Sequence, residues 1–329
     1  MSERGFDRIV VLSDTHMGDP CDTLADEDAA GRLCSFVAGM GPIDELVLLG
    51  DVMDFWKSAF SRTLERARPL LAGLFELPNV AGIVFVPGNH DHHILRLHLY
   101  TEGTGRLERG ERGEPDPVTD NDGVPCAVLE ALRPPSSSVP LRMMYPCHQT
   151  RVAGREVFLT HGHLLGMFER TWWQPKGAWI NRTFMGARGQ MALEQMEQVL
   201  SPYYEMLALS GGIPNLASGG YKVYKMLDGF GRAIGVTRGP RESARRYTSL
   251  EENLAEIAAY VEFFCETPPD VFVFGHTHKG GVAEIPGLPT TAYNPGCWLD
   301  DGRPDTMKGF LLEISEEARL IAVRPDGWQ

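Results

Sequence analysis

Five short segments of the sequence carry side chains that bind metal ions in proteins. They are Asp14-Thr15-His16, Gly50-Asp51-Val52-Met53-Asp54, Gly88-Asn89-His90-Asp91, His161-Gly162-His163 and Gly275-His276-Thr277-His278. Carboxylate and amide oxygens combined with imidazole nitrogens suit Mn²⁺, Fe²⁺ or Zn²⁺ better than a soft cysteine site would. Each segment follows a run of apolar residues, so its polar groups come at the end of a predicted strand. The five segments therefore predict a metal centre.

Seven side chains from these segments are enough to hold two divalent cations. We assign four ligands to each cation: Asp14, His16, Asp51 and His278 to one, and Asp51, Asn89, His161 and His276 to the other. Asp51 is shared, because the two oxygens of a carboxylate can serve two cations about 3.5–4 Å apart. Two such cations make water a strong nucleophile at neutral pH and also polarise a phosphoryl oxygen. We expect Mn²⁺ in both positions, with Fe²⁺ or Zn²⁺ as the alternatives.

Two further side chains in the same segments are candidates for proton transfer. His90 follows a ligand but is not needed as one, so it is placed to donate a proton to the leaving oxygen. Asp54 could orient His90 in a carboxylate–histidine pair. Taken alone, an Asp-x-His pair is also compatible with a turn that carries a surface histidine, and Asn89 or Asp91 could cap a helix. The metal centre is favoured because six of the ten histidines lie in these motifs.

Buried strands are predicted before all five segments, at residues 7–12, 46–49, 83–86, 157–159 and 271–274. Their continuous apolar runs are typical of strands that are covered on both faces. Helices are predicted between and after the first strands, at residues 22–39, 62–77 and 92–98. Strands that alternate with helices indicate a parallel α/β sheet, whose ligands bind beyond the carboxyl ends of the strands. We therefore expect the five segments to meet at one edge of a sheet.

The remaining core is predicted from weaker signals. Residues 101–138 hold few apolar side chains in their first half and predict an exposed loop. Residues 139–152 could supply one or two strands, and Ser249 with Glu252 forms a capping box before an apolar helical stripe. Short strands with hairpin-like spacing are predicted near residues 282–284, 290–293, 310–314 and 320–323. These late strands favour antiparallel additions, and hence an α/β core of two packed mixed sheets flanked by helices.

Residues 164–248 separate the two parts of this core, residues 1–163 and 249–329. The segment holds eleven Lys or Arg residues against six Asp or Glu residues, although the whole chain has a net charge of −13. It also contains three tryptophans, at positions 172, 173 and 179. One hypothesis is a helical insertion whose apolar face packs on the core. The other is a cap over the site, basic toward an anionic substrate and apolar toward the rest of that substrate.

The composition is that of an ordinary globular protein, with 329 residues, 43% hydrophobic and 23% charged. The negative net charge argues against a general nucleic-acid binder. The six cysteines have no C-x-x-C spacing and are expected to be reduced thiols. We expect no signal peptide, and no apolar run approaches the roughly 20 residues that cross a bilayer. A cytoplasmic location is therefore expected. Peripheral contact of residues 164–248 with the inner face of the membrane is a further hypothesis.

The five motifs resemble the full signature of the calcineurin-like metallophosphoesterases. The resemblance lies in Asp14-x-His16, Gly50-Asp51-x-x-Asp54, Gly88-Asn89-His90-Asp91, His161 and Gly275-His276-x-His278. It spans most of the predicted core but not the insertion. It implies a four-layer α/β/β/α sandwich of two mixed sheets, a dinuclear metal site, and Asp54 as the partner of His90. The predicted helical cap insertion is an addition to this core.

Within that family, two segments are similar to the branch that contains UDP-2,3-diacylglucosamine pyrophosphohydrolases. They are Gly50-Asp51-Val52-Met53-Asp54-Phe55-Trp56 and Asn294-Pro295-Gly296-Cys297-Trp298. This similarity implies cleavage of a nucleotide–lipid anhydride beneath a helical cap that associates with membranes. The sequence departs from the branch in two places. Members of the branch commonly have Arg at the position of His90, and His-Gly-Asp at the positions of His161-Gly162-His163. His163 is either a supporting neighbour of the ligands or a substrate contact.

Three functions are compatible with these observations. The leading hypothesis is a dinuclear hydrolase of phosphate diesters or anhydrides that acts on a nucleotide- or lipid-linked substrate. The second is a phosphomonoesterase, a class that includes protein phosphatases. The third is a metal-binding interaction module without catalysis. Such a module would be expected to lack a ligand or His90, and the sequence retains all of them.

Overall fold

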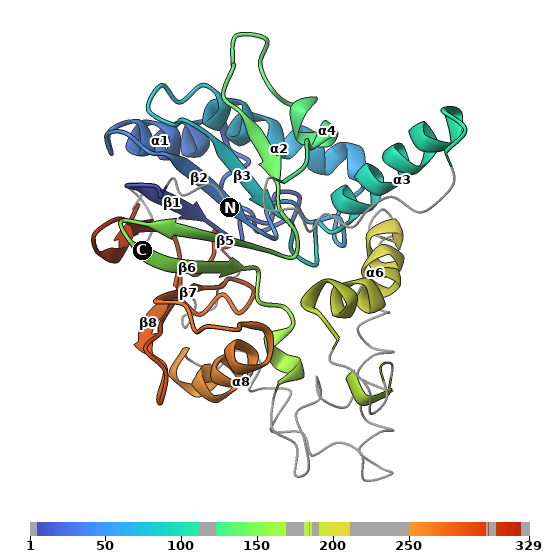
Figure 1. The fold of residues 1–329 in the computed structure, drawn as a ribbon. Coiled ribbons are helices and arrows are strands. Elements are labelled where there is room, and N and C mark those ends of the chain that lie inside the picture. Colours follow the sequence, from blue (N-terminus) through green and yellow to red (C-terminus); the bar gives the residue numbers. More distant parts are fainter. Residues whose placement is uncertain are drawn as a thin grey trace.

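Two β-sheets lie face to face between two layers of helices (Figure 1). The computed structural model describes residues 5–111, 123–168, 181–183, 185, 191–210, 250–300, 302 and 307–323. The strand order is β11-β10-β1-β2-β3-β4 in the six-stranded sheet and β5-β6-β7-β9-β8 in the five-stranded sheet. Helices α1 and α2 cover the first sheet, and α8 covers the second. The predicted four-layer α/β/β/α sandwich is confirmed.

The elements agree closely with the predicted order. The first sheet consists of β1 (Ile9–Leu12), β2 (Glu45–Leu49), β3 (Ile83–Val86), β4 (Leu141–Met143), β10 (Phe310–Ile314) and β11 (Ala318–Ala322). The second consists of β5 (Cys147–Val152), β6 (Arg155–Thr160), β7 (Val271–Val273), β8 (Gly281–Glu284) and β9 (Thr291–Asn294). The helices include α1 (Glu27–Ala38), α2 (Phe60–Phe75), α3 (His93–Glu108), α4 (Ala127–Glu130), α6 (Leu193–Ser210) and α8 (Leu254–Phe264). Two 3₁₀ turns are η1 (Leu165–Met167) and η4 (Leu250–Asn253).

The strands that precede the metal motifs are buried on both faces. In β1, Val10 and Leu12 pack toward α1 and α2, whereas Ile9 and Val11 pack against the second sheet. Strands β2 and β3 repeat this alternation. Because each face meets an apolar layer, the strands need continuous apolar runs rather than an apolar–polar alternation. Complete burial of one such side chain contributes about 1.5–3 kcal/mol, so these strands hold their ends firmly in place.

The five motif-bearing strands divide between the two sheets. β1, β2 and β3 run parallel in the first sheet, and β6 and β7 run parallel in the second. This corrects the expectation of a single sheet edge: the five loops meet where the carboxyl-end edges of two packed sheets adjoin. The late strands β8, β10 and β11 add antiparallel, as predicted, whereas β9 pairs parallel with β7.

Helix α3 corrects another expectation, since it continues to Glu108 where the sequence predicted a loop from Thr101. Only Ile94 and Leu95 of this helix are buried, so its second half shows no apolar stripe that could signal a helix. The Thr101 hydroxyl donates a hydrogen bond to the carbonyl of Leu97 one turn earlier, at 2.9 Å. The short helix α4 also lies within the predicted loop, and residues 112–122 fall outside the described part of the chain.

The first helix begins later than the expected position 22. The Asp26 side chain accepts a hydrogen bond from the backbone N–H of Ala29 at 3.0 Å and caps the helix, which starts at Glu27. Asp22 instead accepts hydrogen bonds from the Gly18 backbone and from Arg66, at 2.7 and 2.6 Å. It therefore ties the loop after β1 to α2 rather than starting a helix.

The insertion is described only in part. Of residues 164–248, the structure describes residues 164–168, which include η1, residues 181–183, residue 185 and residues 191–210, so the three tryptophans lie outside the described residues. Ser249, the expected helix cap, also lies outside them, and η4 and α8 follow it. Within the described residues no helix is both long and apolar enough to cross a membrane. All six cysteines are among the described residues, and no disulfide joins them.

Candidate metal centre

Backbone hydrogen bonds hold the motif-bearing loops against one another. The N–H of His16 donates to the carbonyl of Asp51 at 2.8 Å, and that of Gly275 donates to the carbonyl of His161 at 2.9 Å. The backbone N–H of His90 donates to the Asp51 carboxylate at 2.8 Å. Each of these loops is thus hydrogen-bonded to a loop that follows another strand. The backbone that carries the candidate ligands is therefore held rigidly.

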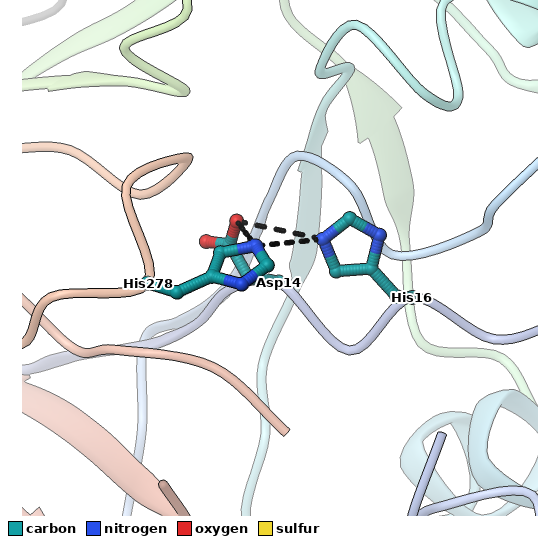
Figure 2. Close-up of side chains that lie close together, drawn as sticks. All are labelled: Asp14, His16 and His278. Atoms are coloured by element: carbon teal, nitrogen blue, oxygen red, sulfur yellow. Dashed lines mark hydrogen bonds and ion pairs between the residues drawn. The ribbon is translucent and has the colours of Figure 1, made fainter. Parts of the chain in front are cut away.

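Asp14, His16 and His278 form the first cluster of candidate ligands (Figure 2). The two Nε2 atoms of His16 and His278 lie 3.0 Å apart. The carboxylate oxygen Oδ1 of Asp14 is 3.4 Å from His278 Nε2 and 3.9 Å from His16 Nε2. Two imidazole nitrogens and a carboxylate oxygen that converge in this way are the donor set of a divalent cation.

Asp51, His161 and His276 form the second cluster. Oδ2 of Asp51 lies 3.0 Å from Nε2 of His161. The other ring nitrogen of His161, Nδ1, is 3.2 Å from the carbonyl of Leu49, so an Nδ1–H donated there leaves Nε2 to face Asp51. Burial lowers the pKa of His161, but the carboxylate of Asp51 outweighs it and raises the pKa to about 9. Because a ligand imidazole must be neutral, metal binding at His161 would release a proton.

Asp51 connects the two clusters. Its Oδ2 atom also lies 3.7 Å from Nε2 of His16, which belongs to the first cluster. Burial alone would raise the pKa of Asp51, but the imidazoles of His161, His90 and His16 hold that pKa well below its ordinary value. A buried, ionised carboxylate between two sets of imidazoles has the chemistry of a bridging ligand.

Asn89, the seventh predicted ligand, directly precedes His90, whose backbone N–H contacts the Asp51 carboxylate. Its side-chain oxygen Oδ1 is buried and has no hydrogen-bond partner among the described residues. Leaving a buried polar group unpaired costs about 1–3 kcal/mol. A cation would satisfy this oxygen, so the residues present fit a pair of divalent cations. The structure therefore brings six of the seven predicted ligands into two adjoining clusters, and the buried oxygen of Asn89 stays a predicted ligand.

Strained backbone conformations coincide with the candidate ligands. Asp14, His16, Asp51, His276 and His278 all have positive φ angles, between 48° and 65°. Among the described residues other than glycine, Ala153 alone shares this conformation. Such a conformation costs roughly 1–2 kcal/mol per residue and persists only where the surrounding structure imposes it. The chain bears this cost at five of its seven candidate ligands, which favours a functional reason for their placement.

Asp54 contacts two histidines with its two carboxylate oxygens. Oδ1 lies 3.0 Å from Nδ1 of His90, and Oδ2 lies 3.2 Å from Nδ1 of His16. The predicted Asp54–His90 pair is thus present, and the contact with His16 is one that the sequence did not suggest. Burial opposes ionisation of Asp54, but the imidazoles of His90 and His16 keep its pKa below the ordinary value. A single buried carboxylate therefore orients both a candidate ligand and the candidate acid.

His90 lies between the metal clusters and the ring of Trp56. Its ring stacks on Trp56, with centroids 4.0 Å apart and planes inclined by 24°. Burial lowers the pKa of His90, but the carboxylates of Asp54 and Asp51 raise it above its ordinary value overall. Nitrogen atoms of His90 and His16 also converge with a carboxylate oxygen of Asp51. His90 is thus within reach of the metal centre, either as a proton donor or as a further ligand.

Asp91 does not cap a helix. Its Oδ1 accepts a hydrogen bond from the backbone of Gly88 at 2.6 Å, and its Oδ2 accepts one from the backbone of Val52 at 2.8 Å. The buried side chain thereby ties the loop after β3 to the loop after β2. Burial and the nearby Asp51 carboxylate raise the pKa of Asp91 to about 7. Asp91 thus supports the loop that carries Asn89 and His90.

Two glycines of the motifs leave room for ligands from other strands. A Cβ atom on Gly275 would collide with the carboxylate of Asp14 and the hydroxyl of Ser13. A Cβ atom on Gly88 would collide with the carboxylate of Asp51 and lie 2.8 Å from the His161 ring. These glycines are required by close approach between loops, a reason that is invisible in the sequence.

The substitution Gly275→Ala is expected to lower the free energy of unfolding of the metal-free protein by about 1–3 kcal/mol, because the methyl group overpacks a rigid site. The matched control is Gly31→Ala in α1, where an added Cβ meets nothing within 4 Å. This control should gain about 0.5–1 kcal/mol, because alanine favours the helix. Urea denaturation of the three proteins measures both changes. Equal stability of Gly275→Ala and the wild type would contradict the described packing around Asp14.

Helix α6 places Glu197 and Tyr204 near the candidate site, and sequence patterns did not indicate either residue. Glu197 accepts a hydrogen bond from His163 at 2.8 Å, and the ring of Tyr204 lies 5.3 Å from that of His163 and 6.3 Å from that of Trp56. Outside this set, Glu205 of the same helix contacts His93 at 2.8 Å, and neither of these two residues belongs to a metal cluster. The partners are separated by more than thirty positions in the sequence, and a glutamate within a helix gives no local sign of burial.

A family model described as calcineurin-like phosphoesterase matches residues 7–280 of the chain. Among solved structures, a dimetal phosphatase from Danio rerio matches with 13% sequence identity and a TM-score of 0.35, covering 98% of this chain and 100% of that one. A phosphopantetheinyl hydrolase from Mycobacterium tuberculosis matches with 13% identity and a TM-score of 0.33, covering 98% of each chain. Vacuolar protein sorting 29 from Cryptosporidium parvum matches with 11% identity and a TM-score of 0.33, covering 97% of each chain. No curated protein matches the chain.

Proposed function

This chain belongs to the calcineurin-like phosphoesterase family of metal-dependent enzymes, and we propose that it is a dinuclear hydrolase of phosphate diesters or anhydrides. The observation that supports two cations is the pair of clusters that Asp51 connects, as a member of one cluster that lies 3.7 Å from His16 of the other. Asp14, His16, Asp51 and His278 would hold one cation, and Asp51, Asn89, His161 and His276 would hold the other. Mn²⁺ is the proposed metal, with Fe²⁺ or Zn²⁺ as alternatives, since the ligands are oxygen and imidazole nitrogen.

The chemistry divides between the cations and the side chains around them. When bound, the cations supply Lewis acidity toward the phosphoryl group and lower the pKa of water that attacks it. His90 donates a proton to the leaving oxygen, and a positioned acid of this kind contributes about 10²–10⁴-fold to the rate. Asp54 holds the His90 ring in place from one side, and Trp56 stacks on its face. The described side chains thus divide into ligands, a proton donor and its supports.

The proposed substrate carries an organic group on the leaving oxygen. The rings of Trp56 and Tyr204 lie on the side of the site where His90 would protonate that oxygen. The indole of Trp56 is partly exposed and offers an apolar surface on which a nucleobase or an acyl chain could pack, with the buried Tyr204 ring beside it. A nucleotide- or lipid-linked diester or anhydride could place its base or acyl chain on this aromatic surface. Residues 164–248 are proposed to act as a cap that contributes Tyr204, and their contact with a membrane surface stays a prediction.

Two synthetic substrates separate the proposed reaction from its main alternative. With Mn²⁺ added, the protein is expected to hydrolyse bis-p-nitrophenyl phosphate, a diester, with a higher kcat/KM than p-nitrophenyl phosphate, a monoester. Release of p-nitrophenol measures both rates. Faster turnover of the monoester would identify a phosphomonoesterase instead. No turnover of either substrate or of nucleotide-sugar anhydrides, with Mn²⁺, Fe²⁺ or Zn²⁺, would favour an interaction module without catalysis.

A further inference from the structure

Glu197 is a buried acidic residue in a part of the chain that supplies none of the candidate metal ligands. It belongs to α6 of the insertion, and its side chain is 1% exposed. One of its oxygens, Oε2, lies 2.8 Å from Nε2 of His163 and accepts a hydrogen bond from the Tyr145 hydroxyl at 2.8 Å. Burial would raise the pKa of Glu197, but His163 and these hydrogen bonds lower it overall. A buried carboxylate that stays ionised needs such partners, and both come from the core.

His163, the partner of Glu197, lies beside the second metal cluster. Its ring centroid is 5.6 Å from that of His161 and 6.2 Å from that of His276. The side chain is 5% exposed. Its second ring nitrogen, Nδ1, is buried and has no hydrogen-bond partner among the described residues. An unpaired, buried nitrogen next to a reactive centre is placed to bind something that enters that centre.

A carboxylate fixes the tautomer of a neutral imidazole. An ionised carboxylate can only accept, so the nitrogen that faces it must carry the proton. In the neutral form of His163, Nε2 is therefore the protonated atom, and Nδ1 keeps a lone pair that accepts a hydrogen bond. A glutamine in place of Glu197 could either accept from Nε2–H or donate to a bare Nε2. Glutamine would keep the shape of the contact but would no longer determine which ring nitrogen of His163 carries the proton.

We propose that Glu197 is a positioning residue of the active site, which holds His163 so that its Nδ1 accepts a hydrogen bond from an O–H group within the site. The proposal rests on the proposed phosphoesterase function. The O–H group is either a hydroxyl of the substrate or a water molecule, and the two sources differ in what they predict. The insertion thereby becomes part of the active site through Glu197 and does more than cover it.

The tautomer is measured on the metal-free protein, independently of activity. In ¹⁵N-labelled wild-type protein, two-dimensional ¹H–¹⁵N correlation of the histidine rings should show His163 protonated on Nε2, with assignment by its loss in His163→Gln. Glu197→Gln should give a mixture of tautomers or Nδ1–H. A wild-type His163 that is protonated on Nδ1 would overturn the proposal even if the variant failed to fold. An unchanged tautomer in Glu197→Gln would overturn it as well.

Kinetics then tests the role of the tautomer, with Glu205→Gln as the matched control. Glu205 lies on the same helix and also pairs with a core histidine, His93, but belongs to neither metal cluster. Glu197→Gln should lower kcat/KM by roughly 10–100-fold, the usual effect of losing such a support, and Glu205→Gln should leave it unchanged. Glu197→Asp, which keeps the carboxylate, should recover part of the loss. In a His163→Gln background, Glu197→Gln should add no further loss.

Two substrates distinguish the sources of the O–H group. If it is water, the loss in Glu197→Gln appears with bis-p-nitrophenyl phosphate, which has no hydroxyl. If it belongs to the substrate, the loss appears only with a hydroxyl-bearing anhydride such as a nucleotide sugar. Equal losses in Glu197→Gln and Glu205→Gln, or an additive loss in the double variant, would overturn the proposal. Absence of wild-type turnover would instead contradict the proposed function, and the tautomer measurement would still stand.

Discussion

Asp51→Asn is expected to lower kcat/KM by at least about a thousandfold and to abolish the rise in unfolding temperature that Mn²⁺ causes in the wild type. Loss of one oriented hydrogen-bond donor at an active site already costs about 10²–10³-fold, and loss of a shared ligand should exceed this. The Asp51 carboxylate lies between both clusters, 3.0 Å from His161 and 3.7 Å from His16. A neutral amide binds cations far more weakly than a carboxylate does.

Asparagine is the least disruptive replacement at this position. Asp51 has a φ of 48°, and asparagine tolerates this region better than most residues. Its side-chain oxygen can still accept the hydrogen bond from the backbone of His90. The variant should therefore still fold without metal, and the Mn²⁺-dependent increase in its unfolding temperature should vanish, since a ligand stabilises a protein by binding the folded state.

A matched control uses the same chemical change away from the site. Asp26→Asn keeps the cap of α1, because asparagine accepts the Ala29 hydrogen bond as well as aspartate does. This variant should keep both activity and the response to Mn²⁺. Differential scanning fluorimetry with and without Mn²⁺ provides the comparison. A normal Mn²⁺ response in Asp51→Asn would show that Asp51 is not a ligand.

His90→Ala is expected to lower kcat by about 10²–10⁴-fold while both metal ions remain bound, because the variant removes the proton donor and no ligand. The loss should depend on the leaving group. An alkoxide leaves poorly without a proton, so alkyl diesters should show the full loss. A p-nitrophenolate leaves readily without protonation, so bis-p-nitrophenyl phosphate should show a smaller one.

Metal analysis decides between the two roles that the geometry allows for His90. Its imidazole lies near Asp54 and also near the His16–Asp51 pair. Metal content measured by mass spectrometry should equal that of the wild type and of His98→Ala, a control histidine in α3. A lower metal content in His90→Ala alone would make His90 a ligand. An equal loss of rate with all leaving groups would exclude it as the proton donor.

The candidate metal centre could be predicted because its residues lie at the ends of strands whose apolar sequences indicate burial. A run such as Ile9-Val10-Val11-Leu12 specifies a strand covered on both faces, and parallel strands bring their carboxyl ends together. Asp14 and Asp51 are then neighbours although 37 positions apart. The division of the five strands between two sheets could not be predicted from the sequence, because a continuous apolar run does not indicate which sheet a strand joins.

Other features depend on tertiary contacts that leave no local pattern. Helix α3 runs to Glu108 with few buried residues, so its second half lacks the periodicity by which helices are predicted. The pairing of Glu197 with His163 joins the insertion to the core across 34 positions. The close approach that requires glycine at position 275 comes from Asp14, in the loop after a strand of the other sheet. In each case the cause lies in packing between distant segments.

Anomalous scattering from crystals soaked in Mn²⁺ would show whether two cations share Asp51. We expect two anomalous peaks about 3.5–4 Å apart, one on each side of the Asp51 carboxylate. One peak should contact Asp14, His16 and His278, and the other Asn89, His161 and His276. A single peak, or none, at this position would mean that Asp51 does not bridge two cations.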